Sequence, residues 1–327
     1  MTSSTRAKVK LGTTGPEVFP LALGCMGMSG MYGASDDAEG LRTIHAAMER
    51  GITLLDTGDF YGMGRNERLV GRAIAGRRER VQVSVKFGAL RGPDGSWLGM
   101  DASPIAVKSA CAYSLERLGV EAIDVYRPAR LDPKVPIEDT IGAIAELVKA
   151  GYVKHIGLSE VGVDTLRRAH AVHPIVDLQI EHSLASRGPE ARIFPALAEL
   201  GTSATLYGVL SRGLLTGKKP TGPTDFRAYL PRFSGENAAT VDALASFARA
   251  RGMTPAQLAI AWSRATQPGF VPVIGARTVA QLEDALGALD HPLSPADVRE
   301  LEALVPEGAI RGTRYAEQHM ANLDSER

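Results

Sequence analysis

The sequence predicts an α/β fold, a (β/α)8 TIM barrel with an N-terminal β-hairpin and a C-terminal helix and tail. Short β-branched runs alternate with longer amphipathic stretches along most of the 327 residues. Eight strand–helix units in this alternation favour a closed barrel of parallel strands. Barrels of this kind routinely reach this length as one unit, so we expect a single domain over residues 1–327.

Each barrel strand is expected where a short apolar run is flanked by turn residues: 21–26, 52–56, 81–87, 123–126, 155–159, 176–180, 204–210 and 270–275. Amphipathic periodicity predicts the helices between them: 37–50, 65–76, 103–119, 137–150, 163–171, 189–200, 237–251, 255–266 and 278–288. Asp36 and Ser103-Pro104 are helix start signals, and Gly119, Gly151 and Gly252 are stop signals.

The two ends of the chain and two long connections complete the prediction. Val9–Leu11 and Val18–Pro20 flank the turn residues 12–15, which predicts a hairpin that closes the bottom of the barrel. Residues after about 291 are expected to form a final helix and an irregular tail. The connections 88–102 and 217–236 are long for this architecture. Both leave the carboxyl ends of strands, which is the face where barrels carry their active sites.

Composition excludes several classes of function. Lys plus Arg and Asp plus Glu both number 37, so the formal charge is zero, which argues against a general nucleic-acid binder. Cys25 and Cys111 are too few for a disulfide framework and lack metal-ligand spacing, so no metal site is expected. The N-terminus lacks the apolar core of a signal peptide, and no stretch approaches a membrane span of roughly 20 apolar residues. We therefore expect a cytoplasmic protein with no membrane partner.

Asp56, Tyr61 and Lys86 carry the clearest chemistry in the chain. Asp56 and Lys86 each close an apolar run, and Tyr61 follows the first run by five residues. A nearby ammonium favours the phenolate form of a tyrosine and so lowers its pKa from the usual value of about 10. The aspartate would hold that ammonium charged and in place. A phenol with such neighbours suits general acid catalysis on a carbonyl oxygen, although each residue alone could equally be turn or strand-end chemistry.

The segments Asp56-Thr-Gly-Asp-Phe-Tyr61-Gly and Ser84-Val-Lys86-Phe-Gly resemble the aldo-keto reductase family. The resemblance continues in order through Gly157-Leu-Ser-Glu160, Gln179-Ile-Glu181, Arg212-Gly-Leu-Leu-Thr-Gly217 and Ile274-Gly-Ala-Arg277. It implies a (β/α)8 barrel that reduces aldehydes and ketones with NADPH. It also implies that Tyr61 is the proton donor, that Lys86 lowers its pKa and that Asp56 pairs with Lys86.

One member of the family's site is missing. Relatives usually carry a histidine where this chain has Ala129, and often a glutamine where it has Pro128. Three explanations stay open. Tyr61 could be the sole donor, helped by water; another side chain, with Arg127 and His182 as candidates, could replace the histidine; or the protein could bind NADPH and catalyse poorly. We favour the first, and we expect Ala129 to widen the pocket for a bulky carbonyl substrate.

The resemblance also assigns the NADPH/NADP+ contacts. Ser159 and Gln179 resemble the pair that binds the nicotinamide carboxamide, and Tyr207 resembles the aromatic residue that stacks on the ring. The expected contacts to the phosphates and adenosine are Leu210, Arg212, Gly213, Gly275, Arg277, Gln281 and Glu283. Gly275 allows close backbone approach, and the helix N-terminus that follows offers free N–H groups to an anion. Arg277 suits a 2′-phosphate, which favours NADPH over NADH.

The substrate pocket is expected to be mostly apolar, which favours an aromatic or bulky small-molecule carbonyl compound. Its expected walls are Met28, Tyr32, Phe60, Phe87, Trp97, Tyr126, Arg127 and Ala129, with parts of 218–236 and Arg314-Tyr315. Two other classes stay open: an NADPH-binding regulatory or sensor protein with weak turnover, and a lyase or aldolase that uses Lys86 as a Schiff base. The nucleotide-binding segments at 207–217 and 274–284 argue against the lyase.

Overall fold

The computed structural model, which describes residues 6–30, 32–222, 225–320 and 323–327, confirms the closed barrel of eight strands. Neighbouring barrel strands are all parallel. In order around the barrel they are β3 (Ala22–Gly24), β4 (Leu54–Gly58), β5 (Gln82–Phe87), β8 (Ile123–Pro128), β9 (Val153–Ser159), β10 (Ile175–Glu181), β11 (Ser203–Tyr207) and β12 (Val271–Gly275).

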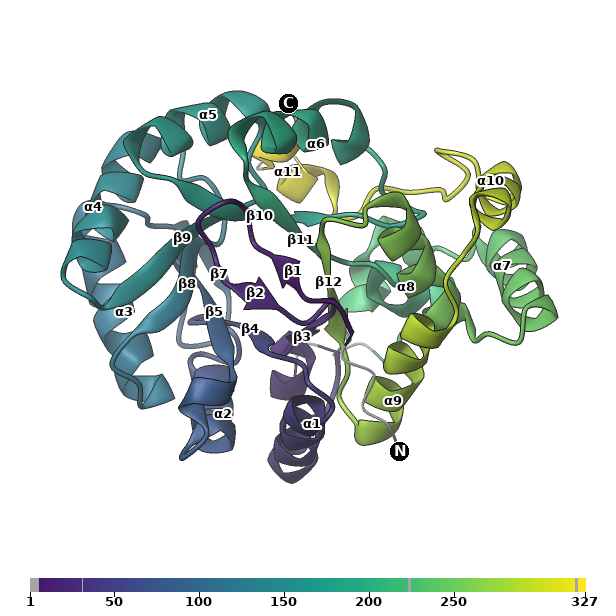
Figure 1. Ribbon diagram of the computed structural model, residues 1–327, viewed down its shortest axis with the longest axis horizontal. Coiled ribbons are helices and arrows are strands. Elements are labelled where there is room, and N and C mark those ends of the chain that lie inside the picture. The colour runs from purple at the N-terminus through teal and green to yellow at the C-terminus, as the bar shows by residue number, and fades with distance from the viewer. Residues whose placement is uncertain (1–5, 31, 223–224, 321–322) are drawn as a thin grey trace.

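Helices surround the barrel on its outside (Figure 1). They are α1 (Asp37–Glu49), α2 (Arg65–Ile74), α3 (Pro104–Leu118), α4 (Ile137–Lys149), α5 (Val163–Val172), α6 (Pro189–Leu200), α7 (Ala238–Ala250), α8 (Pro255–Thr266), α9 (Val279–Gly287), α10 (Pro295–Leu304) and the short α11 (Glu317–Met320). The expected start signals act as caps, since Asp36 accepts a hydrogen bond from Ala38 N at 2.8 Å and Ser103 accepts one from Ala106 N at 3.3 Å. Gly119 ends α3 in the left-handed conformation, with φ of 66°.

The N-terminal hairpin is present and closes the amino end of the barrel. β1 (Val9–Lys10) pairs antiparallel with β2 (Glu17–Val18), and Figure 1 shows both lying in front of the barrel strands. Leu11 at the start of its turn is fully buried in one apolar cluster with Val125 and Val176 of the barrel interior. The interior is therefore sealed at this end, and its open end lies at the strands' carboxyl termini.

Two segments differ from the sequence-based expectation. The seventh barrel strand ends at Tyr207, not at 210, because Gly208 turns the chain with φ of 70°. The connection 88–102, expected only as a long loop, contains a two-stranded ribbon, β6 (Ala89–Arg91) and β7 (Trp97–Met100), around the turn residues 92–96. This ribbon projects from the carboxyl end of β5 and places Trp97 beside the open end of the barrel.

The alternation of side chains along the strands decides which residues reach the inside of the barrel. Ser84 and Lys86 of β5 point inward, where they meet the side chains of Asp56 and Arg127. Phe87, one residue further on, points outward into the apolar layer between barrel and helices. The inside of the barrel therefore holds polar side chains at two depths. Ser84 and Arg127 lie deeper, and Asp56 and Lys86 lie at the open end.

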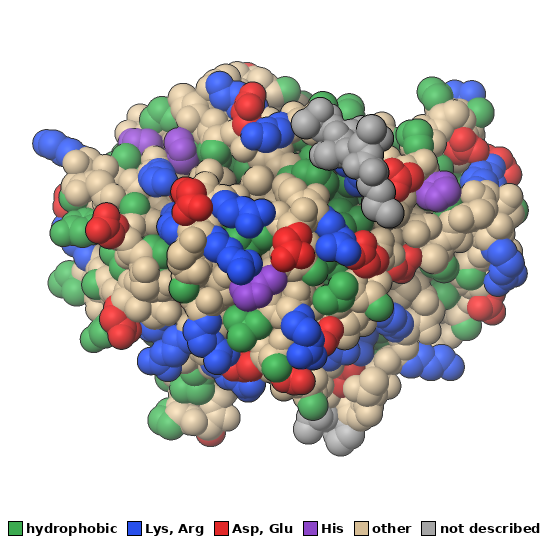
Figure 2. Space-filling view, turned by 60° about the horizontal axis from the view of Figure 1, so that its bottom comes forward, with side chains coloured by type: hydrophobic (Ala, Val, Ile, Leu, Met, Phe, Trp, Pro, Cys, Tyr) green, Lys and Arg blue, Asp and Glu red, His purple; other side chains and the backbone are tan. Residues whose placement is uncertain are grey.

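The surface agrees with the balanced composition. Positive and negative side chains are interspersed on the face shown in Figure 2. Within the described parts of the chain, none of the helices is both long and apolar enough to span a membrane.

Candidate active site

Asp56 and Lys86 form a buried ion pair at the carboxyl ends of the adjacent strands β4 and β5. The Lys86 Nζ lies 2.5 Å from an Asp56 carboxylate oxygen, and both side chains are at most 7% exposed. Ser84 and Gln179 donate hydrogen bonds to the other Asp56 oxygen, at 3.2 and 2.9 Å. The carboxylate is therefore fixed by three donors, and it holds the ammonium at the open end of the barrel.

Tyr61 is presented by the turn between β4 and α2. Its backbone N–H donates to Gly58 O at 3.1 Å. The turn is fixed from below by the buried amide of Asn66, which accepts from Thr57 at 2.7 Å and donates to Cys25 O at 2.8 Å. The first helical turn of α2 thus ties the loop to two barrel strands, and the Tyr61 ring is 5% exposed.

The electrostatics of Tyr61 differ from the sequence-based expectation. The Lys86 Nζ lies 5.3 Å from the centre of the Tyr61 ring, so the two side chains are neighbours. Burial nevertheless raises the pKa of Tyr61 well above its ordinary value, the Asp56 carboxylate raises it further, and Arg130 acts in the opposite direction. Burial also lowers the pKa of Lys86, against the effect of Asp56. Burial, and not the expected effect of Lys86, therefore determines the direction of the Tyr61 pKa shift, and the phenol stays protonated.

A cavity of approximately 790 Å³ opens above this trio. It brings together most of the site residues named from the sequence: Asp56, Tyr61, Lys86, Ser159, Gln179, Tyr207, Leu210, Arg212, Gly213, Gly275, Arg277, Gln281, Tyr32, Phe60, Trp97 and Ala129. Tyr315 and Leu323 reach it from the C-terminal tail. Residues of seven barrel strands, the loop after β8 and the tail therefore share one site.

Three of the expected pocket residues do not line this cavity, and strand alternation explains why. Phe87 and Tyr126 point outward; their rings stack at 4.3 Å between centres, and the Tyr126 hydroxyl donates to Val107 O. Arg127 points inward but lies one layer too deep, where it pairs with Asp177 at 2.9 Å. All three are fully buried structural residues.

Met28 and Glu283 also lie outside the cavity lining. Met28 belongs to the short helical turn after β3 and packs in the layer of apolar side chains beneath the helices, at 2% exposure. Glu283 of α9 forms an ion pair with Arg50 at the end of α1. Glu283 thus links two helices and does not line the cavity, whereas Gln281, half a turn earlier, does.

Neither of the two proposed substitutes for the histidine reaches the catalytic trio. His182 is fully buried, stacks on Trp262 at 5.0 Å between ring centres and contacts Glu190 at 2.9 Å, so it has a structural position. The residue that does line the cavity beside Ala129 is Arg130. The sequence signal that could have found it is the segment Arg130-Leu-Asp-Pro133, directly after the fourth barrel strand.

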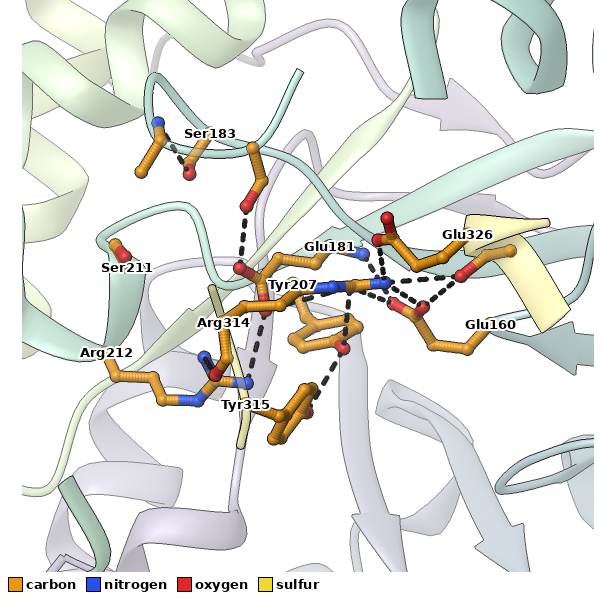
Figure 3. Close-up of polar contacts among 12 residues, drawn as sticks. Glu160, Glu181, Ser183, Tyr207, Ser211, Arg212, Arg314, Tyr315 and Glu326 are labelled. Carbon is orange, nitrogen blue, oxygen red and sulfur yellow. Dashed lines mark hydrogen bonds and ion pairs between the residues drawn. The ribbon is translucent and has the colours of Figure 1, made fainter. Parts of the chain in front are cut away.

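The C-terminal tail is fixed across the site by a buried ion pair, shown in Figure 3. Arg314 donates to both carboxylate oxygens of Glu160, at 2.8 and 2.6 Å, and Glu160 is fully buried just beyond β9. This pair places the next residue, Tyr315, against Tyr207, with 3.4 Å between their hydroxyls. The Arg212 guanidinium lies 4.6 Å from the centre of the Tyr315 ring. The tail thus completes one wall of the cavity.

Comparison with known proteins identifies the family. The sequence model of the Aldo/keto reductase family matches residues 20–306. The chain is 42% identical to the probable aldo-keto reductase 1 of Glycine max over 96% of its own length and 93% of that protein. The chain belongs to the aldo/keto reductase family.

Solved structures agree with this assignment. The glycerol dehydrogenase AKR11B4 from Gluconobacter oxydans superposes with a TM-score of 0.83 at 27% identity, covering 96% of this chain and 99% of that one. The holo form of the aldo-keto reductase AKR11C1 from Bacillus halodurans superposes with a TM-score of 0.78, also at 27% identity and with the same coverage. As an aldo/keto reductase, the protein is an oxidoreductase that acts on carbonyl compounds.

The residues of this aldo/keto reductase fit a dinucleotide cofactor. Its cavity is lined by one acid, Asp56, and by the cations Lys86, Arg91, Arg130, Arg212, Lys218, Arg227 and Arg277, a balance that suits a polyphosphate. An ideal Cβ placed on Gly275 would meet no atom within 4 Å, so this strand end leaves space open for a ligand. The consecutive residues Ser211 and Arg212 both have positive φ, 45° and 55°, a strained turn of the kind found at ligand sites.

Glu160 is expected to stabilise this aldo/keto reductase in a pH-dependent way. Burial raises the pKa of Glu160, but Arg314, with smaller contributions from Arg130 and Ser325, more than offsets it and lowers that pKa from 4.5 to about 2. An acid whose pKa is lowered by folding stabilises the folded state above its unfolded pKa, and that stabilisation is lost as the pH falls. Glu160→Gln should therefore lower the free energy of unfolding by on the order of 3 kcal/mol at neutral pH. The difference between the native protein and the variant should shrink as the pH falls from 4.5 to about 2. Urea unfolding at several pH values measures this; a difference that does not change with pH contradicts it.

Proposed function

We propose that the protein is an NADPH-dependent reductase that converts aldehydes or ketones to alcohols, with Tyr61 as the proton donor. The observation that carries the proposal is the meeting of Tyr61 and the Lys86–Asp56 pair with Ser159 and Gln179 in one cavity. A carbonyl group that is reduced needs a proton donor beside a hydride source. Tyr61 supplies the proton, and Ser159 and Gln179 are placed to hold the nicotinamide that carries the hydride.

The residues that would hold NADPH extend from the trio to α9. Gln179 donates from Nε2 to Asp56 and Thr205, which leaves Oε1 to accept a hydrogen bond from a carboxamide. Ser159, on the neighbouring strand, adds a hydroxyl at the same level. Arg212 and the strained turn at 211–213 would contact the pyrophosphate, and Arg277 would contact the 2′-phosphate. When bound, NADPH supplies the hydride.

The chain's own groups then act on the carbonyl oxygen. Tyr61 is protonated at neutral pH, because burial raises its pKa, and its hydroxyl can donate a hydrogen bond to that oxygen. As negative charge develops on the oxygen, the proton moves from the phenol to it. The resulting phenolate is stabilised by the neighbouring Lys86 ammonium, whose charge is held in place by Asp56. A proton from solvent restores the phenol.

The space beside Ala129 favours a bulky or aromatic substrate. The Ala129 side chain ends at Cβ, and Phe60, Trp97 and Tyr32 add aromatic surface to the same cavity. Much of the cavity volume would be taken by the cofactor, and the remaining part lies beneath the β6–β7 ribbon and the tail. A large apolar carbonyl compound would bury more surface there than a small aldehyde would.

The experiment that tests the proposal measures NADPH consumption with aldehydes and ketones of graded size, together with NADPH binding followed by protein fluorescence. Saturable binding and turnover, with kcat/KM rising with substrate size, support the proposal. Saturable binding without turnover of any carbonyl compound would instead favour a regulatory role. Trapping of a substrate on Lys86 by borohydride, without any need for NADPH, would favour Schiff-base chemistry.

Arg277 is expected to set the preference for NADPH over NADH. The residue follows β12, and its Nη1 donates to Tyr32 O at 2.9 Å, so the guanidinium is fixed at one end of the cavity. Arg277→Ala should raise KM for NADPH by roughly 10- to 100-fold, since a charge-assisted hydrogen bond is worth about 1.5–3 kcal/mol, and should change KM for NADH far less. Steady-state kinetics with both cofactors measure the two effects. Equal effects on NADPH and NADH would remove Arg277 from the 2′-phosphate site.

A further inference from the structure

We propose that Arg130 is a catalytic residue, whose guanidinium donates a hydrogen bond to the substrate's carbonyl oxygen in the place where relatives carry histidine. This inference rests on the proposed function, because it assigns a second donor to the same reacting oxygen. It replaces the expectation that Tyr61 acts as the sole donor beside an enlarged, water-filled space.

The position of Arg130 is the first argument. The side chain folds back over the residue that precedes it, so that Nη1 donates to Ala129 O at 2.6 Å and approaches Ser159 Oγ at 3.4 Å. The Arg130 guanidinium therefore lies between the Ala129 carbonyl and the Ser159 hydroxyl. It lines the same cavity as Tyr61 and Lys86. Its charge also opposes the rise in the pKa of Tyr61.

The partners of Arg130 are the second argument. Lys86, Arg212 and Arg227 on the cavity walls are each paired with a carboxylate, at 2.5, 3.2 and 2.6 Å. Arg130, by contrast, contacts only neutral oxygens within the described parts of the chain: Ala129 O, Ser159 Oγ and the Tyr315 hydroxyl. No acid neutralises its charge at contact distance there. Glu160 acts on its charge only from beyond contact distance, so the guanidinium is not held in an ion pair and can turn toward an oxygen that becomes negative.

The hydrogen-bonding capacity of the guanidinium is the third argument. Nη1 is engaged by Ala129 and Ser159, and Nη2 donates one hydrogen to Tyr315 at 3.2 Å. The Nε–H group and the second hydrogen on Nη2 form no hydrogen bond with the described residues, so both stay available to a ligand. The three bonds that do form fix the group before substrate binds, which is the preorganisation that electrostatic catalysis requires.

The tail contributes to this preorganisation. Tyr315 is 185 residues from Arg130 in sequence and is brought to it by the Arg314–Glu160 pair beneath. On the other side, Asp132 holds the Arg130 loop through hydrogen bonds from Ala102 N and Lys134 N, at 3.1 and 2.9 Å. The guanidinium is therefore held between a rigid loop and a fixed tail.

The chemical step divides the work between two side chains. The carbonyl carbon gains a hydride from NADPH, and the π-electron pair of the C=O bond moves onto oxygen. Arg130 stabilises the developing negative charge by hydrogen bonding and remains protonated, because a guanidinium does not release its proton in proteins. Tyr61 transfers its proton to the oxygen, and the product is the alcohol. Over one turnover, the carbonyl compound, NADPH and one proton from solvent, which restores the Tyr61 phenol, give the alcohol and NADP+.

Arg130→Met tests the assignment. We expect kcat for a neutral aldehyde such as benzaldehyde to fall about 100- to 1000-fold, the usual cost of losing one preorganised donor. The dissociation constant for NADPH, measured by fluorescence, should change by less than threefold, and the melting temperature should show that the variant is folded. Arg168→Met is the control, since it removes an exposed arginine that pairs with Glu138 at 2.7 Å on the outer helices, and its effect on kcat should be far smaller.

A second substitution separates catalysis from structural support. Placing histidine at the adjacent position, as Ala129→His in the Arg130→Met background, should restore kcat at least tenfold, because it returns a donor to the same region. Failure of this rescue, with both variants folded and NADPH bound normally, would overturn the assignment.

The substrate's own charge gives the alternative outcome. If Arg130 instead bound a carboxylate on the substrate, Arg130→Met would raise KM for 4-carboxybenzaldehyde and leave kcat for benzaldehyde near the native value, which would overturn the proposal. Absence of turnover in the native enzyme would be a failure of the proposed function itself. Turnover that is lost in Tyr61→Phe but retained in Arg130→Met would be a failure of this inference alone.

Discussion

Tyr61→Phe is expected to lower kcat for carbonyl reduction by about 100- to 10,000-fold, the range that a positioned general acid contributes. The phenylalanine ring can keep the edge-on contact with Phe60, whose ring centre lies 4.7 Å away, so the loop after β4 should stay in place. Only the hydroxyl is removed, and with it the proton that the carbonyl oxygen must receive. Steady-state assays with NADPH and a reactive aldehyde measure the loss.

A matched control is available in the same cavity. Tyr32→Phe removes a phenolic hydroxyl that also lines the site but belongs to the loop before α1. Its effect on kcat should be much smaller than that of Tyr61→Phe, and both variants should bind NADPH as the native protein does. Comparable losses in the two variants, or a Tyr61→Phe enzyme with native turnover, would show that Tyr61 is not the proton donor.

Arg127→Met is expected to cost about 3–5 kcal/mol of the free energy of unfolding, because it leaves the buried Asp177 carboxylate without its cation. Both side chains of this pair are 0% exposed, and they lie 2.9 Å apart inside the barrel. Thr205 donates to the same carboxylate oxygen at 2.6 Å, but a hydroxyl cannot neutralise the charge. Urea unfolding followed by circular dichroism measures the change.

The double variant Arg127→Met/Asp177→Asn removes both charges and should recover at least half of the lost stability, since neutral groups carry a much smaller desolvation penalty. Arg167→Met provides the surface comparison. Its ion pair with Glu199 is 2.7 Å long but about half exposed, so its loss should cost less than about 1 kcal/mol. A single Arg127→Met variant as stable as the native protein would contradict the structural role of this arginine.

The different roles of Tyr61 and Arg127 show which site residues can be predicted from the sequence pattern alone. Tyr61 was assigned to the site as the proton donor, and Arg127 as part of the pocket wall and a candidate to replace the missing histidine. The two-residue period of a strand separates adjacent residues: with Lys86 inside the barrel, Phe87 has to face the helices. That alternation could have been applied in advance to Phe87 and Tyr126. The depth of Arg127 could not, because it depends on the register between strands.

The charge state of Tyr61 is a second example. The sequence places an acid, a phenol and an amine on neighbouring strand ends, and all three meet as expected. The direction of the pKa shift was nonetheless predicted incorrectly, because burial and the Asp56 carboxylate raise the pKa of Tyr61 more than the cation Arg130 lowers it. Desolvation depends on everything packed around a group, and the sequence does not list those neighbours.

The sequence by itself determined the barrel, its order of strands and helices, and the strand-end positions of Asp56, Lys86, Ser159 and Gln179, because these follow from local periodicity and from parallel strands ending on one face. Only the tertiary structure decided what lies beside Ala129. Arg130 is held there by Tyr315, which a buried ion pair carries across the site from 185 residues away. Such a contact depends on how distant segments pack, and local propensity contains no information about it.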